Sequence, residues 1–383
     1  MKIQMKEITT KTIEIGYSAT DKLNVFLSEN YKNILVVCDT NTVKFHDNIT
    51  AEHVYYTYPS DVHATPEAAA EISDSFIECD VMIACGAGTI HDITRYAAHE
   101  RNIPFIAYPT AASVDGFVSN VAAMTIDHRK KTLISTPPIA LFADPNVFTT
   151  APNKLTVSGV CDIIGKYISL FEWKFSALIT DEQLDHEIIK MTEEAVNKLM
   201  NLDVNDENYT ITVMEGLTLS GMVIQMYGNS RPASGAEHHL SHLWEMHCIN
   251  GETPALHGEK VGVAALILLE KYKNLKEIIY KPKSITRGYL APVYGDLTDG
   301  IIDENTPSSL DSISQANIDK NIDAIFELIR ELPDLDKLTA YYNKIGALTT
   351  LAELELPDSD EFLAKTLEFA PYVRNRLTLL KIL

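Results

Sequence analysis

The stretch Val81–Asp92, which reads VMIACGAGTIHD, predicts the fold of the amino-terminal part of this 383-residue chain. Its first five residues form an apolar run of the kind that is typical of a strand buried in a parallel sheet. Gly86 and Gly88 follow at once and precede a helical pattern. A strand, a glycine-rich turn and a helix in this order predict a site where backbone amides meet a phosphate group.

Two further apolar runs, Asn33–Cys38 and Ile103–Tyr108, flank this stretch in the sequence. Pro66–Ile77 lies between the first run and Val81, and its leading proline and apolar spacing indicate a helix. Strands that alternate with helices in this way predict an α/β, Rossmann-like, dinucleotide-binding domain, which we expect over residues 1–150.

Long amphipathic patterns replace the strand-like runs from about residue 150 onward, and they predict an all-α domain over residues 151–383. Ser234 and Glu237 predict a capping box at the start of one helix, and Tyr280–Ser314, rich in Pro, Gly and acidic residues, predicts a long loop. The expected helices are Gly159–Leu178, Asp181–Asn201, Thr212–Tyr227, Glu237–Met246, Lys260–Lys273 and Ile318–Leu332.

The composition excludes several classes of function. Hydrophobic residues make up 46% and charged residues 22%, as in ordinary soluble enzymes. Asp and Glu number 53 against 32 Lys and Arg, and the formal net charge of -21 argues against binding to nucleic acid. The five cysteines are scattered without a C-x-x-C pair, which favours a reducing cytoplasm over a disulfide framework. The longest apolar stretch, Val261–Leu269, is too short for a membrane span.

The glycine loop departs from the usual dinucleotide fingerprint, because it lacks the third glycine and the acidic residue about 20 positions later. Asp39 instead ends the preceding strand-like run, where it could hold an adenosine ribose hydroxyl and would favour NAD over NADP. Thr89 and Asp92 can form a T-x-x-D helix start. The alternative is a tight strand-to-helix turn with a capped helix and no nucleotide.

Three side chains have local contexts that suit one divalent metal: Asp162, His238 and His257. One carboxylate and two neutral nitrogens suit Zn²⁺, Ni²⁺ or Fe²⁺ and leave coordination positions open for a substrate oxygen. His238 and His242 lie one helical turn apart, so either could meet His257. The alternatives are surface or core histidines, and an Asp162 that caps a helix or pairs with Lys166.

Five motifs in the same order, with a sixth segment near the carboxyl end, resemble the sn-glycerol-1-phosphate dehydrogenase family. That family belongs to the iron-containing alcohol dehydrogenase and glycerol dehydrogenase superfamily. The resemblance implies a Rossmann-like α/β domain followed by an all-α domain, the dehydroquinate synthase-like or iron-containing alcohol dehydrogenase architecture. The matching segments are Gly86–Asp92, Pro109–Gly116, Gly159–Lys166, Ser230–His238, His257–Val261 and Ala370–Arg376.

The resemblance also implies roles for individual residues. It makes Asp162, His238 and His257 the metal ligands and places His242 near the reacting centre. Asp115 is expected to bind substrate hydroxyls and, like His242, to act in proton transfer. The residues expected at the dinucleotide are Asp39, Gly86, Gly88, Thr89, Asp92, Thr110 and Ser113.

Arg231 and Lys166 are expected to neutralise a substrate phosphate, with a structural fork that ties down its own loop as the alternative for Arg231. The expected reaction is the reversible reduction of dihydroxyacetone phosphate to sn-glycerol 1-phosphate, a step of phospholipid metabolism, with NAD or NADP and one divalent metal ion. We expect a homo-oligomer, a dimer or larger. The alternatives are a glycerol or other polyol dehydrogenase, a dehydroquinate-synthase-like lyase and an inactive nucleotide-binding protein.

Overall fold

The computed structural model describes residues 8–76, 78–126, 129–281 and 285–383. These residues form two compact units. The sheet unit contains the residues up to Ile163 together with Glu194–Asn229, and the helical unit contains Ile164–Glu193 and Ser230–Leu383. Residues 151–163 and 194–229, which the sequence assigns to the helical part, therefore group with the sheet.

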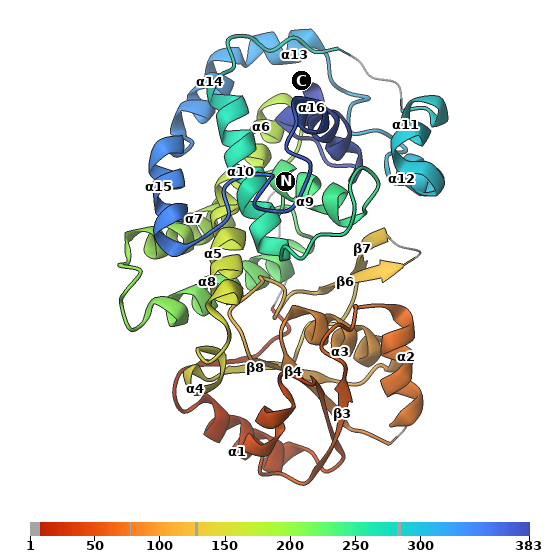
Figure 1. The fold of residues 1–383 in the computed structure, drawn as a ribbon, viewed down its shortest axis with the longest axis vertical. Helices are drawn as coiled ribbons and strands as arrows, with labels where there is room; N and C mark the ends of the chain where they lie inside the picture. Colours follow the sequence, from red (N-terminus) through yellow and green to blue (C-terminus); the bar gives the residue numbers. More distant parts are fainter. Residues whose placement is uncertain (1–7, 77, 127–128, 282–284) are drawn as a thin grey trace. The chain divides into compact units, whose positions relative to one another are not determined.

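A six-stranded parallel sheet organises the sheet unit (Figure 1). The strand order is β1-β8-β5-β4-β2-β3, and a separate antiparallel pair joins β6 and β7. The three predicted strands correspond to β2, β4 and β5. The strands are β1 Thr12–Ile15, β2 Ile34–Asp39, β3 His53–Tyr58, β4 Val81–Gly86, β5 Phe105–Pro109, β6 Val121–Ile126, β7 Arg129–Ile134 and β8 Ala140–Ala143.

The two faces of the sheet carry separate apolar clusters. Leu35 and Val37 of β2 pack with residues of α2 and α3 on one face. Val36 and Cys38 of the same strand pack with Leu23 of α1 on the other face. Because both faces are covered, the central strands read as continuous apolar runs and show no polar alternation. The helices of this unit are α1 Ala19–Asn30, η1 Val43–Asn48, α2 Pro66–Ser75, α3 Gly88–Arg101, α4 Pro145–Phe148, α5 Asn153–Ile164 and α8 Tyr209–Tyr227.

The carboxyl-terminal part is rich in helices, as predicted, but three details of the prediction are corrected. The expected loop at Tyr280–Ser314 is wrong, since α11 and α12 lie within it; the side chain of Thr286 accepts a hydrogen bond from the Tyr289 amide and caps α11. The predicted helix Gly159–Leu178 breaks at Gly165 into α5 and α6, and the helix predicted at Ile318–Leu332 is divided at Asn321. Helix α7 His186–Asn201 begins in the helical unit, and its residues from Glu194 onward belong to the sheet unit. The other elements are α6 Lys166–Ile179, α9 Ala236–Glu245, α10 His257–Lys273, α11 Arg287–Tyr294, η2 Gly295–Leu297, α12 Thr298–Glu304, α13 Gln315–Lys320, α14 Ile322–Glu331, α15 Leu335–Ile345, α16 Asp360–Phe369, η3 Ala370–Tyr372 and α17 Leu379–Ile382.

Over the part of the chain that the structure describes, every helix is too short or too polar to cross a membrane.

Candidate active site

Three neighbouring strands end together at the carboxyl edge of the parallel sheet. Gly86 at the end of β4 lies opposite Pro109 at the end of β5, and Asp39 ends β2 on the other side of β4. The amide of Thr110 also donates to the Gly86 carbonyl at 3.0 Å. This edge collects predicted nucleotide-binding residues that are far apart in the sequence, at the place where open α/β sheets bind ligands.

Asp39 turns the chain at the end of β2. Its Oδ1 accepts hydrogen bonds from the amides of Asn41 at 2.8 Å and Thr42 at 2.9 Å. This Asx-turn pattern fixes the orientation of the carboxylate at the sheet edge. A carboxylate fixed there can accept hydrogen bonds from ribose hydroxyls and repel a 2′-phosphate.

The glycine loop leads directly into α3, and the expected T-x-x-D helix start is wrong. The helix begins at Gly88 with Ala87 as its N-cap, so Thr89 already lies in the first turn. Because alanine has no side-chain acceptor, the N-cap leaves the first-turn amides to other partners. The N-terminus of this 14-residue helix therefore suits a pyrophosphate group.

Asp92 pairs with Arg95 and does not cap the helix. Arg95 Nη1 donates to Asp92 Oδ1 at 2.6 Å, and the Arg95 side chain is fully buried. The same guanidinium donates to the carbonyls of Phe117 at 3.1 Å and Val121 at 3.0 Å. Asp92 thus neutralises a buried cation that holds the loop after β5, and its contact with a nucleotide stays a prediction.

The loop after β5 carries Thr110, Ser113 and Asp115. Thr110 and Ser113 are buried, and the hydroxyl of Ser158 on α5 donates to the Ser113 carbonyl at 3.3 Å. Asp115 is partly exposed, and its amide donates to Asp162 Oδ2 at 3.1 Å. The loop therefore joins the predicted substrate residue to a predicted metal ligand within the sheet unit.

Asp162 lies in the last turn of α5, so it is not the N-cap that one alternative proposed. Its side chain is fully buried. A buried carboxylate is costly unless hydrogen bonds or a cation compensate for its lost hydration, and the Asp115 amide supplies one such bond.

Histidines from two packed helices meet in the helical unit. The ring centroids of His238 and His257 are 5.3 Å apart, and those of His242 and His257 are 5.7 Å apart. His238 and His242 lie one turn apart on α9, with centroids separated by 5.9 Å, and His257 is the first residue of α10. The helix pair therefore brings both α9 histidines to His257, and proximity alone does not choose between them.

Carboxylates orient two of these rings. Nδ1 of His238 hydrogen-bonds to Glu237 Oε1 at 2.7 Å, and Nδ1 of His257 hydrogen-bonds to Glu245 Oε1 at 2.8 Å. A neutral histidine that donates from Nδ1 to a carboxylate keeps its Nε2 lone pair for a metal ion. The ring tautomers set by these contacts fit metal ligation.

Glu237 also replaces the expected capping box. Its Oε1 accepts a hydrogen bond from the amide of Gly235 at 2.7 Å, and Gly235 is the N-cap of α9. Ser234 precedes the N-cap and supplies no cap bond, so the predicted Ser234 contribution is wrong. Glu237 therefore accepts hydrogen bonds from the start of α9 and from the ring of His238, a predicted metal ligand, at the same time.

His242 stays neutral in this surrounding. Burial, aided by the nearby Arg374, holds its pKa well below the ordinary value. Glu245 remains ionised although burial alone would raise its pKa, because its contact with the His257 ring holds that pKa well below its usual range. A neutral imidazole can accept a proton from an alcohol and return it to an alkoxide.

Arg231 is committed to the protein itself. Its Nε donates to Glu182 Oε1 at 2.8 Å and its Nη2 to Glu182 Oε2 at 3.0 Å. Nη2 also donates to the carbonyls of Glu172 at 3.0 Å and Leu377 at 3.2 Å. These contacts favour the alternative in which Arg231 ties down its loop. Lys166, the first residue of α6, is also buried.

Sequence reasoning missed Glu237 and Glu245 as partners of the predicted ligands. Both are acidic residues on α9, and Glu237 adjoins His238 in the sequence. That adjacency is a weak signal, because glutamates are common in helices. The pairing of Glu245 with His257 depends on how α9 packs on α10, which no local pattern encodes.

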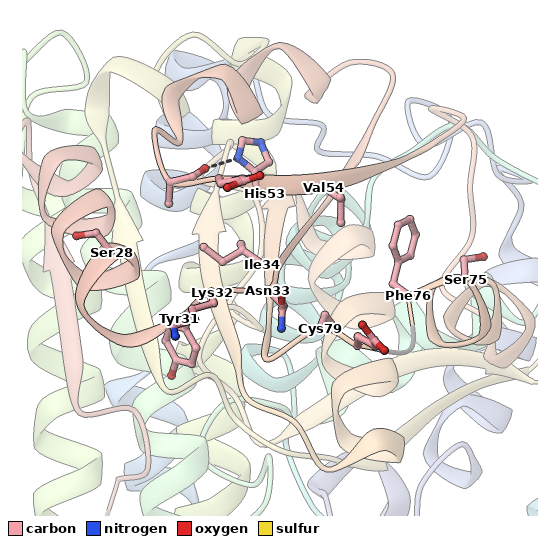
Figure 2. Close-up of a pocket in the computed structure, with 13 residues that line it drawn as sticks. Ser28, Tyr31, Lys32, Asn33, Ile34, His53, Val54, Ser75, Phe76 and Cys79 are labelled. Carbon is pink, nitrogen blue, oxygen red and sulfur yellow. Dashed lines mark hydrogen bonds between the residues drawn. The ribbon is translucent and has the colours of Figure 1, made fainter.

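A hollow of about 870 Å³ lies at the amino-terminal end of β2 and β3, away from the carboxyl edge. Figure 2 shows Ile34, His53, Phe76 and Cys79 among the residues that line it. Its lining includes none of the predicted site residues. The sequence gives no reason to connect this hollow with the candidate active site.

Sequence comparisons agree with these observations. Residues 14–152 match the family model for iron-containing alcohol dehydrogenase. Glycerol-1-phosphate dehydrogenase [NAD(P)+] of Bacillus licheniformis is 33% identical over 98% of this chain and 89% of its own length. The protein of the same name from Bacillus velezensis is 37% identical over 70% of this chain and 73% of its own length.

Solved structures share the fold at low sequence identity. A probable glycerol dehydrogenase from Sinorhizobium meliloti aligns with a TM-score of 0.64 at 16% identity, covering 94% of this chain and 88% of that one. Sulfoacetaldehyde reductase from Bifidobacterium kashiwanohense, in complex with NAD+, aligns with a TM-score of 0.63 at 17% identity, covering 98% and 95%. The predicted fold class is confirmed, and the extended identity to the Bacillus proteins shows that this chain belongs to the glycerol-1-phosphate dehydrogenase family.

Proposed function

We propose that this protein is a metal-dependent, NAD(P)-dependent oxidoreductase that interconverts dihydroxyacetone phosphate and sn-glycerol 1-phosphate. The observation that carries the proposal is the pair of histidines, His238 and His257, each oriented through Nδ1 by its own carboxylate. The relatives named glycerol-1-phosphate dehydrogenase supply the substrate class.

Asp162, His238 and His257 are the ligands that we propose for one divalent metal ion. Asp162 belongs to the sheet unit, and His238 and His257 belong to the helical unit; the family resemblance supports their combination. One carboxylate with two imidazoles suits Zn²⁺, Ni²⁺ or Fe²⁺, and sequence and geometry leave the choice among them open. The competing group is His242 with Glu245 and His257, and in it the carboxylate that accepts the Nδ1 hydrogen bond of His257 would also be a metal ligand.

When bound, the metal ion polarises the substrate carbonyl and the nicotinamide supplies or accepts the hydride. The chain's own residues handle position and protons. Asp115 accepts hydrogen bonds from the substrate hydroxyls, and the neutral His242 imidazole passes the proton to and from the substrate oxygen. Asp39 binds the adenosine ribose, and the N-terminus of α3 binds the pyrophosphate.

The substrate phosphate needs a cation, because the chain carries a formal net charge of -21. Arg231 is already engaged by Glu182 and two carbonyls. For Lys166, the buried first residue of α6, the phosphate role that the family resemblance implies stays our proposal.

The assay that tests the function is NADH oxidation with dihydroxyacetone phosphate, followed by chiral analysis of the product. Formation of sn-glycerol 1-phosphate is expected, with far weaker turnover of unphosphorylated dihydroxyacetone. Equal or better turnover of the unphosphorylated ketone would identify a polyol dehydrogenase.

A homo-oligomer and a cytoplasmic location complete the proposal. β3 is an edge strand of the sheet, and Val54 and Tyr55 on it are 52% and 50% exposed. An exposed apolar edge is normally covered, and a second copy of the chain would cover it.

The cysteines are free thiols, which agrees with a reducing compartment. Light scattering of the purified protein tests the oligomeric state.

A further inference from the structure

The loop Asp115–Ser119 rests on helix α8, an element to which the sequence assigned no function. The hydroxyl of Ser220 on α8 donates to Asp115 Oδ2 at 2.8 Å. Gln225 Nε2, further along the same helix, donates to the Val118 carbonyl. A Cβ at Gly221 would lie 2.9 Å from the Asp115 carbonyl oxygen. The backbone of α8 therefore lies close to the backbone of the loop at Gly221, and the adjacent Ser220 is in hydrogen-bond contact with the Asp115 carboxylate.

Helix α3 also holds this loop. The buried Arg95 guanidinium donates to the carbonyls of Gly116 and Phe117. Together with the bond from Gln225, these bonds hold the loop backbone at three successive residues, Gly116, Phe117 and Val118. The remaining freedom of Asp115 is the rotation of its side chain.

The backbone and the side chain of Asp115 make two different contacts. Its amide donates to Asp162 Oδ2 at 3.1 Å, and its own Oδ2 accepts from Ser220. The bond from Ser220 restricts the rotation of the Asp115 carboxylate. Ser220 itself is 4% exposed, so water does not compete readily for its hydroxyl.

We infer that Ser220 is a positioning residue that aligns the Asp115 carboxylate with the substrate hydroxyl, so that α8 contributes to substrate selectivity. This inference rests on the proposed function, in which Asp115 binds that hydroxyl. Removing one hydrogen bond to a charged group, with the misalignment that follows, corresponds to a loss of about tenfold in kcat/KM.

The test compares two substrates in wild type and in Ser220→Ala. Dihydroxyacetone phosphate carries the free hydroxyl on a hydroxymethyl group, and hydroxyacetone phosphate has a methyl group in place of that hydroxymethyl group. We expect kcat/KM to fall about tenfold for the first and by less than about twofold for the second. NADH affinity and metal content should stay at wild-type values.

Thr218→Val is the matched control. Thr218 is a buried hydroxyl residue on the same helix, and its Oγ1 has no hydrogen-bond partner in the described part of the chain. This variant should leave the ratio of the two kcat/KM values unchanged. Ser220→Cys, which keeps a weak donor of similar size, should give an intermediate ratio.

Equal losses for both substrates in Ser220→Ala would make Ser220 a merely structural residue and overturn the inference, as would failure of both the Ala and the Cys variants to fold. The assay of the wild-type protein distinguishes failure of the proposed function from failure of the inference about Ser220. Wild-type protein without turnover of dihydroxyacetone phosphate defeats the proposed function and the inference with it, whereas wild-type turnover combined with an unchanged substrate ratio in Ser220→Ala defeats the inference alone.

Discussion

Replacing Gly159 with alanine tests how closely α5 packs on the loop that carries the predicted nucleotide-binding residues Thr110 and Ser113. A Cβ at Gly159 would lie 2.2 Å from the carbonyl oxygen of Ala112 and 3.0 Å from its carbonyl carbon. Van der Waals contact needs well over 3 Å, so the backbone must move by roughly 1 Å. Ala112 lies between Thr110 and Ser113, and the loop cannot shift without moving both.

Overpacking of this kind lowers the free energy of unfolding by about 1–3 kcal/mol. We expect a value at the upper end of this range, because the carbonyl group of Ala112 is part of the backbone and cannot rotate away as a side chain could. Glycine to alanine inside a helix normally gains about 0.5–1 kcal/mol. We therefore expect Gly159→Ala to lower the free energy of unfolding by about 2 kcal/mol and to weaken NADH binding several-fold. Gly288→Ala in α11 is the control, because no atom lies within 4 Å of its added Cβ.

Chemical denaturation gives the stability of both variants, and NADH fluorescence titration gives the cofactor affinity. The control should unfold at or slightly above the wild-type midpoint and bind NADH normally. A Gly159→Ala protein with wild-type stability and wild-type NADH affinity would refute the close approach of α5 to the loop.

Three further changes give distinct outcomes. Asp39→Ser should raise the ratio of kcat/KM for NADPH to that for NADH, because the carboxylate opposes the 2′-phosphate; an unchanged ratio removes Asp39 from the cofactor site. Arg231→Ala should lower the free energy of unfolding by about 3–5 kcal/mol, because Glu182 and two carbonyls lose a buried partner; unchanged stability with a selective loss of dihydroxyacetone phosphate affinity would restore the phosphate role. Burial raises the pKa of Glu172 from 4.5 to about 8. Between these two pH values the folded state keeps the Glu172 proton, whereas the unfolded state has lost it. The free energy of unfolding therefore falls as the pH rises from 4.5 to about 8. Glu172→Gln should flatten that fall in denaturation measured at pH 5.5 and 8, and an equal slope in both proteins would contradict the assignment.

The strands and helices that the sequence predicts are those with strong local patterns. β2, β4 and β5 are continuous apolar runs because they are buried on both faces, and such runs are visible without any knowledge of tertiary structure. β3 escaped prediction because the edge strand His53–Tyr58 carries tyrosines and a histidine on partly exposed positions. The helices in Tyr280–Ser314 were missed because Pro292 and nearby acidic residues resemble loop composition, although Thr286 supplies an ordinary cap.

In the candidate site, too, the features with a local sequence pattern were predicted and those without one were missed. The glycine loop and the one-turn spacing of His238 and His242 follow from local sequence. The contacts of Arg231 with Glu182, of Glu245 with His257 and of Ser220 with Asp115 join residues that are 49, 12 and 105 positions apart. Such contacts depend on tertiary packing and cannot be predicted from local sequence. For this reason Arg231 was predicted to bind a phosphate, whereas in the structure it donates hydrogen bonds to Glu182 and to two backbone carbonyls.

The most direct test of the account is elemental analysis of purified wild-type protein and of four variants, which are Asp162→Ala, His238→Ala, His257→Ala and His242→Ala. Wild type and His242→Ala should each retain about one divalent metal ion per chain, and the other three should lose it while still binding NADH, since none of the predicted nucleotide-binding residues is changed. His242→Ala should turn over slowly despite its metal. Metal that stays in His238→Ala and disappears from His242→Ala would contradict the proposed ligand set, and full activity in metal-free protein would contradict the mechanism.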